Sequence, residues 1–243
     1  MLEAFQNLFA PPRHMLFLVA AAWLGLTLSE RRAERHTISK DDLNNLVFFG
    51  LLAFVLGGRL VSVLQNIAIF AQKPLDIFSI NANLFDSPGA FAFALLAAAV
   101  YGQRSQIGFW NSLDALTPFF AVFAVGLGLS HLADGTIHGT PTSAPWGIQF
   151  QDETTHPVSH YEVLASLLTL GWVWRFGQNP RPGIIFLSFA ALTSASQILL
   201  QAFYPVPSLL LGQYRNGQVF AWAALLLCFI LIESRLGSES RTG

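Results

Sequence analysis

Two histidines and an aspartate lie within the nine residues HLADGTIHG, directly after a long apolar run. An unperturbed imidazole has a pKa of about 6.5, so His131 can act as a general acid or base near neutral pH. Asp134 lies three residues further on and can orient the histidine ring. We therefore predict that His131 and Asp134 are catalytic.

Two more histidines lie in HPVSHYE, where His156 and His160 are four residues apart and can share one helix face. His-x-x-x-His is a zinc-ligand spacing, but the glutamate that follows the first histidine in metalloproteases is missing here. Because such loop histidines more often form hydrogen bonds than bind metal, we predict neither a metal nor a cofactor. The alternative is a metal-dependent enzyme whose ligands are His131, His138, His156 and His160.

Polar side chains also interrupt the apolar segments. Arg59 lies within FVLGGRLVSVL, and a charge in the membrane normally faces a cavity or a partner. Its guanidinium can bind two oxygens of a lipid phosphate. Alternatively, it reaches a membrane interface or pairs with a carboxylate such as Asp114 or Glu162. Gln197 and Gln201, four residues apart on one face of a helix, either join neighbouring helices or bind the hydroxyls of a substrate.

The composition indicates an integral membrane protein. Hydrophobic residues make up 53% of the 243 residues and charged residues only 11%, whereas soluble domains have about 25% charged residues. The net charge of -1 gives no basic surface, so we expect no nucleic-acid partner. The single cysteine, Cys228, lies in an apolar run and is expected to pack in the core.

Seven segments approach the roughly 20 apolar residues that a spanning helix needs. They are residues 14–29, 43–70, 88–102, 115–133, 158–175, 183–203 and 217–233. We predict an all-α integral membrane protein with seven transmembrane helices in a single domain, 1–243, and long outer loops at about 71–87 and 134–157. Most Lys and Arg residues then lie on one side, which places the N-terminus outside and the C-terminus in the cytoplasm. We expect Gly57 and Gly58 to allow close approach of a neighbouring helix or a headgroup. We expect APWGIQF to form a short extended or interfacial element.

Short motifs from about residue 16 to 233 carry a resemblance to a known family. In order they are LGGR (56–59), DALTP (114–118) with Gly126, Gly135 with Gly139, PWG-x-x-F (145–150), HP and YE (156–162) and GQ (217–218). In this order and spacing the chain resembles the prolipoprotein diacylglyceryl transferases, seven-helix membrane enzymes of bacteria. The resemblance implies transfer of a diacylglyceryl group from phosphatidylglycerol to a prolipoprotein cysteine, with release of glycerol phosphate. It also implies a multi-pass protein of the bacterial plasma (inner) membrane.

The partners implied are a phospholipid and either a prolipoprotein or another membrane protein. The substrate-binding residues that we predict are Arg59, Gly139, His156, Tyr161, Glu162, Gln197 and Gln201.

The chain departs from the family pattern mainly where the family carries charge. Gly128 stands in place of an arginine, Thr136 of a glutamate, Gln197 of an arginine and Gln201 of a glutamate; Ser87 stands in place of a histidine, and His131 and Asp134 stand in place of asparagines. Since all but Gly128 are polar, we predict a divergent transferase that moves a diacylglyceryl or related lipid group at the outer face. The alternative is a catalytically inactive member that binds lipid or forms a subunit of a membrane complex.

Overall fold

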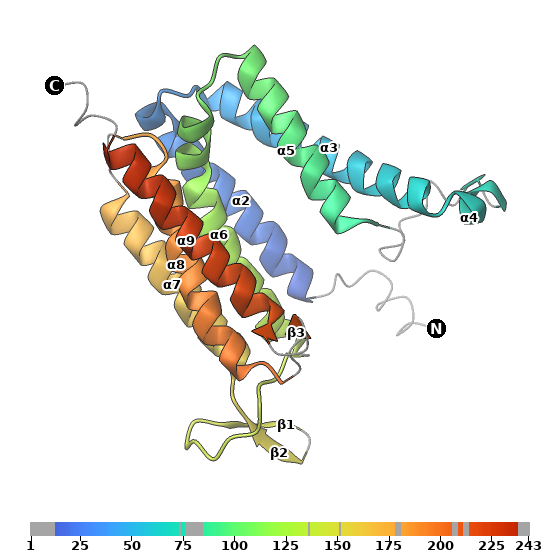
Figure 1. Ribbon diagram of the computed structural model, residues 1–243, viewed down its shortest axis with the longest axis vertical. Helices are drawn as coiled ribbons and strands as arrows, with labels where there is room; N and C mark the ends of the chain where they lie inside the picture. The colour runs from blue at the N-terminus through green and yellow to red at the C-terminus, as the bar shows by residue number, and fades with distance from the viewer. Residues whose placement is uncertain are drawn as a thin grey trace, which may run out of the picture. The chain divides into compact units, whose positions relative to one another are not determined.

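The computed structural model describes residues 13–72, 74–75, 85–135, 137–150, 152–177, 181–205, 209–210 and 214–237. The described chain is mostly helical (Figure 1). Its contacts divide it into two compact units. The first unit comprises residues 1–32 and 113–243, and the second comprises residues 33–112.

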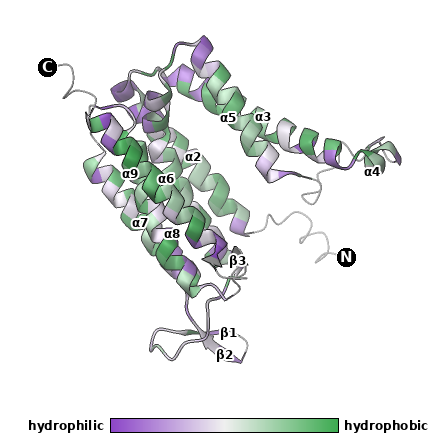
Figure 2. Cartoon of the chain, viewed as in Figure 1, coloured by the Kyte–Doolittle hydropathy of each residue, from purple (hydrophilic) through white to green (hydrophobic). Residues whose placement is uncertain are grey.

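Each of the seven predicted segments contains a long helix. These helices are α2 (Arg13–Ala33), α3 (Lys40–Gln65), α5 (Ser87–Arg104), α6 (Phe109–Asp134), α7 (Val158–Phe176), α8 (Ile184–Leu200) and α9 (Asn216–Gly237). Apolar residues cover most of their length, and hydrophilic residues gather toward their ends (Figure 2). Within the described chain, four stretches are long and apolar enough to cross a membrane: Lys40–Gln65, Phe109–Asp134, Ile184–Phe203 and Asn216–Gly237. The mostly helical membrane class is thus supported, whereas seven spans and the orientation stay predictions.

The predicted helix over 43–70 is interrupted. α3 ends at Gln65, Asn66 leaves the helical conformation with φ -123°, and the short helix α4 (Ile67–Gln72) follows. The Asn66 side chain donates a hydrogen bond to the Ser62 carbonyl at 2.9 Å, and its backbone N–H donates to the same oxygen. Such local side-chain bonds compete with the helical ladder, which explains the break. Most of the predicted loop at 71–87 lies outside the described residues.

The predicted loop at 134–157 contains an antiparallel hairpin of β1 (Ile148–Phe150) and β2 (Glu153–Thr155). This hairpin confirms the extended element expected for APWGIQF. The loop is anchored to the 3-10 turn that follows α8, because the Thr140 N–H donates to the Phe203 carbonyl at 2.8 Å. The remaining short elements are η1 (Glu34–His36), η4 (Gln201–Phe203), β3 (Leu209–Leu210) and β4 (Tyr214–Arg215).

In the second unit, α3 and α5 pack closely through small residues. A Cβ atom at Gly57 would lie 2.3 Å from Cβ of Phe93, and one at Gly58 would lie 2.8 Å from Cβ of Ala90. The predicted close approach at these two glycines is therefore confirmed. Asp86 caps α5, since its Oδ1 accepts a hydrogen bond from the Gly89 N–H at 2.6 Å.

In the first unit, a buried carboxylate fixes α8 against α6. Asp114 is 1% exposed, and its two oxygens accept hydrogen bonds from the N–H groups of Gly183 at 2.6 Å and Phe186 at 2.9 Å. A negative charge is favourable at this position, because the first N–H groups of a helix lack partners within it. Gly183 adopts φ +95°, which favours glycine. Asp114, one of the two carboxylates considered for Arg59, thus caps α8.

Replacing Gly57 with alanine should lower the free energy of unfolding by about 1–3 kcal/mol, because the added methyl group would overpack against Phe93. Gly50→Ala is the matched control in the same helix, since no atom lies within 4 Å of a Cβ there. This control should be neutral or slightly stabilising, because alanine favours helix more than glycine. Thermal unfolding in detergent measures both variants, and equal effects would contradict the packing argument.

Candidate functional site

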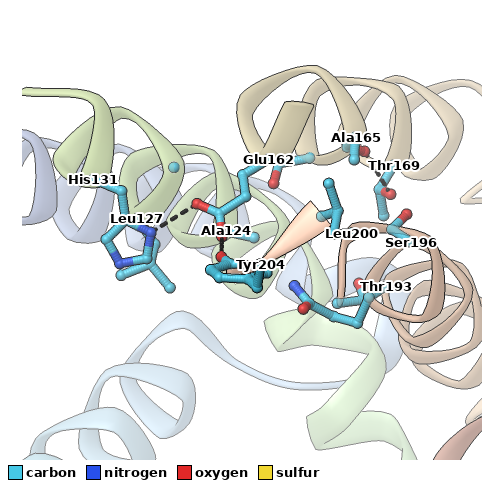
Figure 3. A pocket seen from close by; sticks show the side chains of 13 residues that line it. Ala124, Leu127, His131, Glu162, Ala165, Thr169, Thr193, Ser196, Leu200 and Tyr204 are labelled. Carbon is cyan, nitrogen blue, oxygen red and sulfur yellow. Dashed lines mark hydrogen bonds and ion pairs between the residues drawn. The ribbon is translucent and has the colours of Figure 1, made fainter. Parts of the chain in front are cut away.

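A cavity of about 330 Å³ lies between α6, α7 and α8 of the first unit (Figure 3). Apolar residues such as Ala124, Leu127 and Ala165 form part of its wall. Its volume is at the lower end of the range of about 300–1,000 Å³ found for ligand pockets. The cavity can therefore hold a group of the size of a lipid headgroup.

His131 and Glu162 form a hydrogen-bonded pair at the cavity wall (Figure 3). Nδ1 of His131 lies 2.7 Å from Oε2 of Glu162, and the two side chains are 32% and 11% exposed. Because Nδ1 faces the carboxylate, Nε2 is the ring nitrogen that can accept a proton. The pair therefore has the geometry of a general base with an orienting carboxylate.

Tyr204 completes this group by donating a hydrogen bond from its hydroxyl to Oε1 of Glu162 (Figure 3). Burial raises the pKa of Tyr204 above its ordinary value of 10.0, and the hydrogen bond to Glu162 and its negative charge raise this pKa further. Arg215 fixes the chain here, since its Nη1 donates to the carbonyls of Gln201 and Tyr204. Both Glu162 oxygens thus have a donor.

The aspartate predicted to orient His131 lies elsewhere. Oδ1 of Asp134 is 3.7 Å from Nδ1 of His14, and the His14 and Asp134 side chains are 33% and 41% exposed. The carboxylate beside the His131 ring belongs to Glu162 instead.

Three of the predicted substrate-binding residues meet where the loop at 134–157 joins α7: Gly139, His156 and Tyr161. The Tyr161 hydroxyl accepts a hydrogen bond from Nε1 of Trp146 at 2.8 Å and lies 3.2 Å from Nδ1 of His156. The Gly139 N–H donates to the His156 carbonyl at 3.1 Å, and a Cβ at Gly139 would lie 2.5 Å from that oxygen. These contacts hold the loop against the start of α7.

The predicted histidine pair on one helix face is wrong. α7 begins at Val158, after Pro157 with φ -78° and ψ 69°, so His156 precedes the helix whereas His160 lies within it and is exposed. The His138 ring instead stacks on Phe150 at a centroid distance of 4.1 Å. Among the described residues, no group of three or more His, Cys, Asp or Glu side chains could hold a metal, so the four-histidine site is not assembled.

The two glutamines have different surroundings. Gln197 lines the cavity, whereas Gln201 follows the end of α8 and packs against Gly217, where a Cβ would lie 2.4 Å from Cδ of Gln201. Arg59 belongs to the second unit, where its guanidinium carbon lies 5.5 Å from the centre of the Phe70 ring.

A family model for prolipoprotein diacylglyceryl transferase matches residues 12–233. The chain belongs to the prolipoprotein diacylglyceryl transferase family. Three relatives are phosphatidylglycerol–prolipoprotein diacylglyceryl transferases. Those of Geobacter sulfurreducens and Pseudomonas putida are 27% and 28% identical, covering 88% and 90% of this chain and 85% and 84% of their own length. That of Aromatoleum aromaticum is 30% identical and covers 69% of this chain and 67% of its own.

In this member of the prolipoprotein diacylglyceryl transferase family, Gly128 sets the distance between α6 and α7. A Cβ at Gly128 would lie 3.0 Å from Cγ2 of Val163 and 3.2 Å from its backbone nitrogen. Val163 directly follows Glu162, and His131 lies one turn after Gly128. The absent side chain therefore lets α6 approach α7 at the level where His131 meets Glu162.

Several residues of this family member's cavity have no sequence pattern that would have selected them. Tyr204 lies in YPVP, which has no motif that predicts a bond to Glu162. Ser166 and Thr193 also line the cavity, but serine and threonine are common in membrane helices. A helical-face comparison of α7 and α8 could have placed Ser166 and Thr193 toward the bundle, whereas Tyr204 depends on the turn after α8.

The raised pKa of Tyr204 predicts a pH-dependent stability. Above about pH 10 the unfolded chain loses the phenol proton while the folded chain keeps it, so the free energy of unfolding falls as pH rises. Tyr204→Phe should reduce this fall, and Tyr101→Phe in α5 is the control for loss of a tyrosine. Chemical unfolding followed from pH 8 to 11 measures the slopes. Equal slopes for the wild type and Tyr204→Phe would contradict the prediction.

Proposed function

We propose that this family member transfers a diacylglyceryl or related lipid group to an acceptor thiol at the outer face of the bacterial plasma membrane. The observation that supports this most directly is the 2.7 Å contact between His131 and Glu162 at the wall of a headgroup-sized cavity. The names of the relatives give phosphatidylglycerol as donor and prolipoprotein as acceptor. We propose the same classes of donor and acceptor for this chain.

In the proposed step, Nε2 of His131 accepts the proton of the acceptor thiol. The sulfur electron pair then forms a bond to the glyceryl carbon that carries the phosphate. The carbon–oxygen bond to phosphate breaks, and its electron pair leaves with glycerol phosphate, so the products are a thioether and a phosphomonoester. A positioned base contributes about 10²–10⁴-fold to such a reaction.

The orienting role that the sequence suggested for Asp134 passes to Glu162 in this proposal. Glu162 is less exposed, holds the Nδ1 side of the ring and is itself held by Tyr204. We retain Arg59 as the proposed binding residue for an anionic group, because its planar guanidinium suits two phosphate oxygens. We propose that Gly139, His156 and Tyr161 shape the outer loop through which the acceptor reaches the site, and that Gln201 supports the turn after α8.

A second candidate function, lipid binding without turnover, is favoured by the charge of the cavity. None of the described residues that line it is Lys or Arg. Stabilising a leaving phosphate normally requires cationic or preorganised donor groups. A member that binds lipid or serves as a subunit of a membrane complex would not need them.

His131→Ala should lower thioether formation about 100-fold or more, because the thiol would lose its base. The assay combines the purified full chain with phosphatidylglycerol and a peptide that carries the acceptor cysteine, and mass spectrometry detects the product. If the wild type gives no product but still binds phospholipid, the second candidate replaces the transferase. Unchanged product formation by His131→Ala would exclude His131 as the base.

Glu162→Gln and Asp134→Asn form a matched pair that separates the two orienting carboxylates. Each variant replaces a carboxylate with an amide of nearly the same shape. We expect Glu162→Gln to lower thioether formation at least tenfold, since the imidazolium loses its charge partner, and Asp134→Asn to have little effect. The opposite order would return the orienting role to Asp134.

A further inference from the structure

Three polar side chains at the cavity have no hydrogen-bond partner within the part of the chain that the structure describes. Ser166 on α7 and Thr193 and Gln197 on α8 line the cavity, and among the described residues their side chains take part in no hydrogen bond. Polar groups in an apolar setting are stabilised when they find partners. A ligand in the cavity would therefore gain hydrogen bonds from three side chains without breaking any.

Two other hydroxyl groups at the cavity already donate hydrogen bonds to backbone carbonyls of their own helices. Oγ1 of Thr169 donates to the Ala165 carbonyl, and Oγ of Ser196 donates to the Leu192 carbonyl, both at 2.9 Å. Each of these oxygens retains lone pairs and can only accept a further hydrogen bond. They favour a ligand that donates hydrogen bonds, and a phosphodiester has no proton to donate.

The charges at the cavity also favour an uncharged ligand over a phosphate. Its acidic side chain, Glu162, is 11% exposed, and no Lys or Arg is found among the described lining residues. A phosphate placed beside Glu162 would bring two negative charges together in a partly desolvated setting, and the Arg215 guanidinium nearby is already bonded to the backbone carbonyls of Gln201 and Tyr204. An uncharged group avoids this cost.

We propose that this cavity, taken as the lipid site of the function proposed above, binds an uncharged polyol group of a lipid headgroup and not its phosphate. A hydroxyl is both donor and acceptor, so it matches the amide of Gln197 and the hydroxyls of Ser166 and Thr193 as well as the acceptor oxygens of Thr169 and Ser196. The terminal glycerol of phosphatidylglycerol and the sugar of a glycosyl diacylglycerol both have this chemistry.

Native mass spectrometry of the full chain in an amine-oxide detergent, which carries no sugar, tests this proposal with dioctanoyl lipids. Phosphatidylglycerol and neutral glucosyl diacylglycerol should bind with similar affinity, and phosphatidic acid about tenfold more weakly because it lacks the polyol. Phosphatidic acid binding as tightly as phosphatidylglycerol would overturn the proposal, as would failure of the glucosyl lipid to bind. Free glycerol that competes as well as the lipids would overturn the assignment to a lipid headgroup.

Thr193→Val and Gln197→Leu should each weaken phosphatidylglycerol and glucosyl diacylglycerol severalfold while leaving phosphatidic acid unchanged. The matched controls are Thr27→Val in α2 and Gln103→Leu in α5, neither of which lines the cavity. Unfolding midpoints show whether each variant remains folded. Equal weakening of all three lipids in a folded variant would overturn the proposal. The binding measurement is independent of the transfer assay. If the protein forms the thioether product but its lipid affinities do not follow the expected order, the polyol assignment is overturned and the proposed transferase function stands.

Discussion

The candidate site depends on one buried carboxylate, Glu162, which accepts hydrogen bonds from two directions. His131 on α6 approaches one oxygen and Tyr204, after α8, donates to the other, so the carboxylate on α7 joins three segments. A buried charge with partners on both oxygens is far less costly than an unpaired one. The contact therefore links the His131 ring and the turn after α8 at the wall of the cavity.

Small residues make these contacts possible. Gly128 brings α6 against α7, and Gly57 and Gly58 do the same for α3 and α5 in the other unit. Between membrane helices there is little hydrophobic driving force, so van der Waals contact at small residues supplies much of the packing energy. In place of the arginine that the family resemblance implied at Gly128, the chain therefore has a close helix contact. The close approach at Gly128 lies one turn before the residue that forms the histidine–glutamate pair.

Family membership and cavity chemistry thus carry different information. The match over residues 12–233 assigns the chain to a family of lipid transferases. The described lining of the cavity provides hydroxyls, an amide and a histidine–carboxylate pair, which set what it can bind. The fold and the family do not identify the ligand, because ligand specificity depends on the side chains of the site. An uncharged polyol fits those side chains better than a phosphate.

The sequence alone determined the membrane class, the positions of the long helices and the family, because apolar length and ordered motifs are local properties. It also selected His131, Glu162 and Gln197, which the structure places at one cavity. Only the tertiary structure decided that Glu162 and not Asp134 faces His131, that Tyr204 joins them and that His156 lies outside α7. Those outcomes depend on helix approach, a proline before α7 and the turn after α8. Such contacts form between residues far apart in the chain, so their sequence spacing does not encode them.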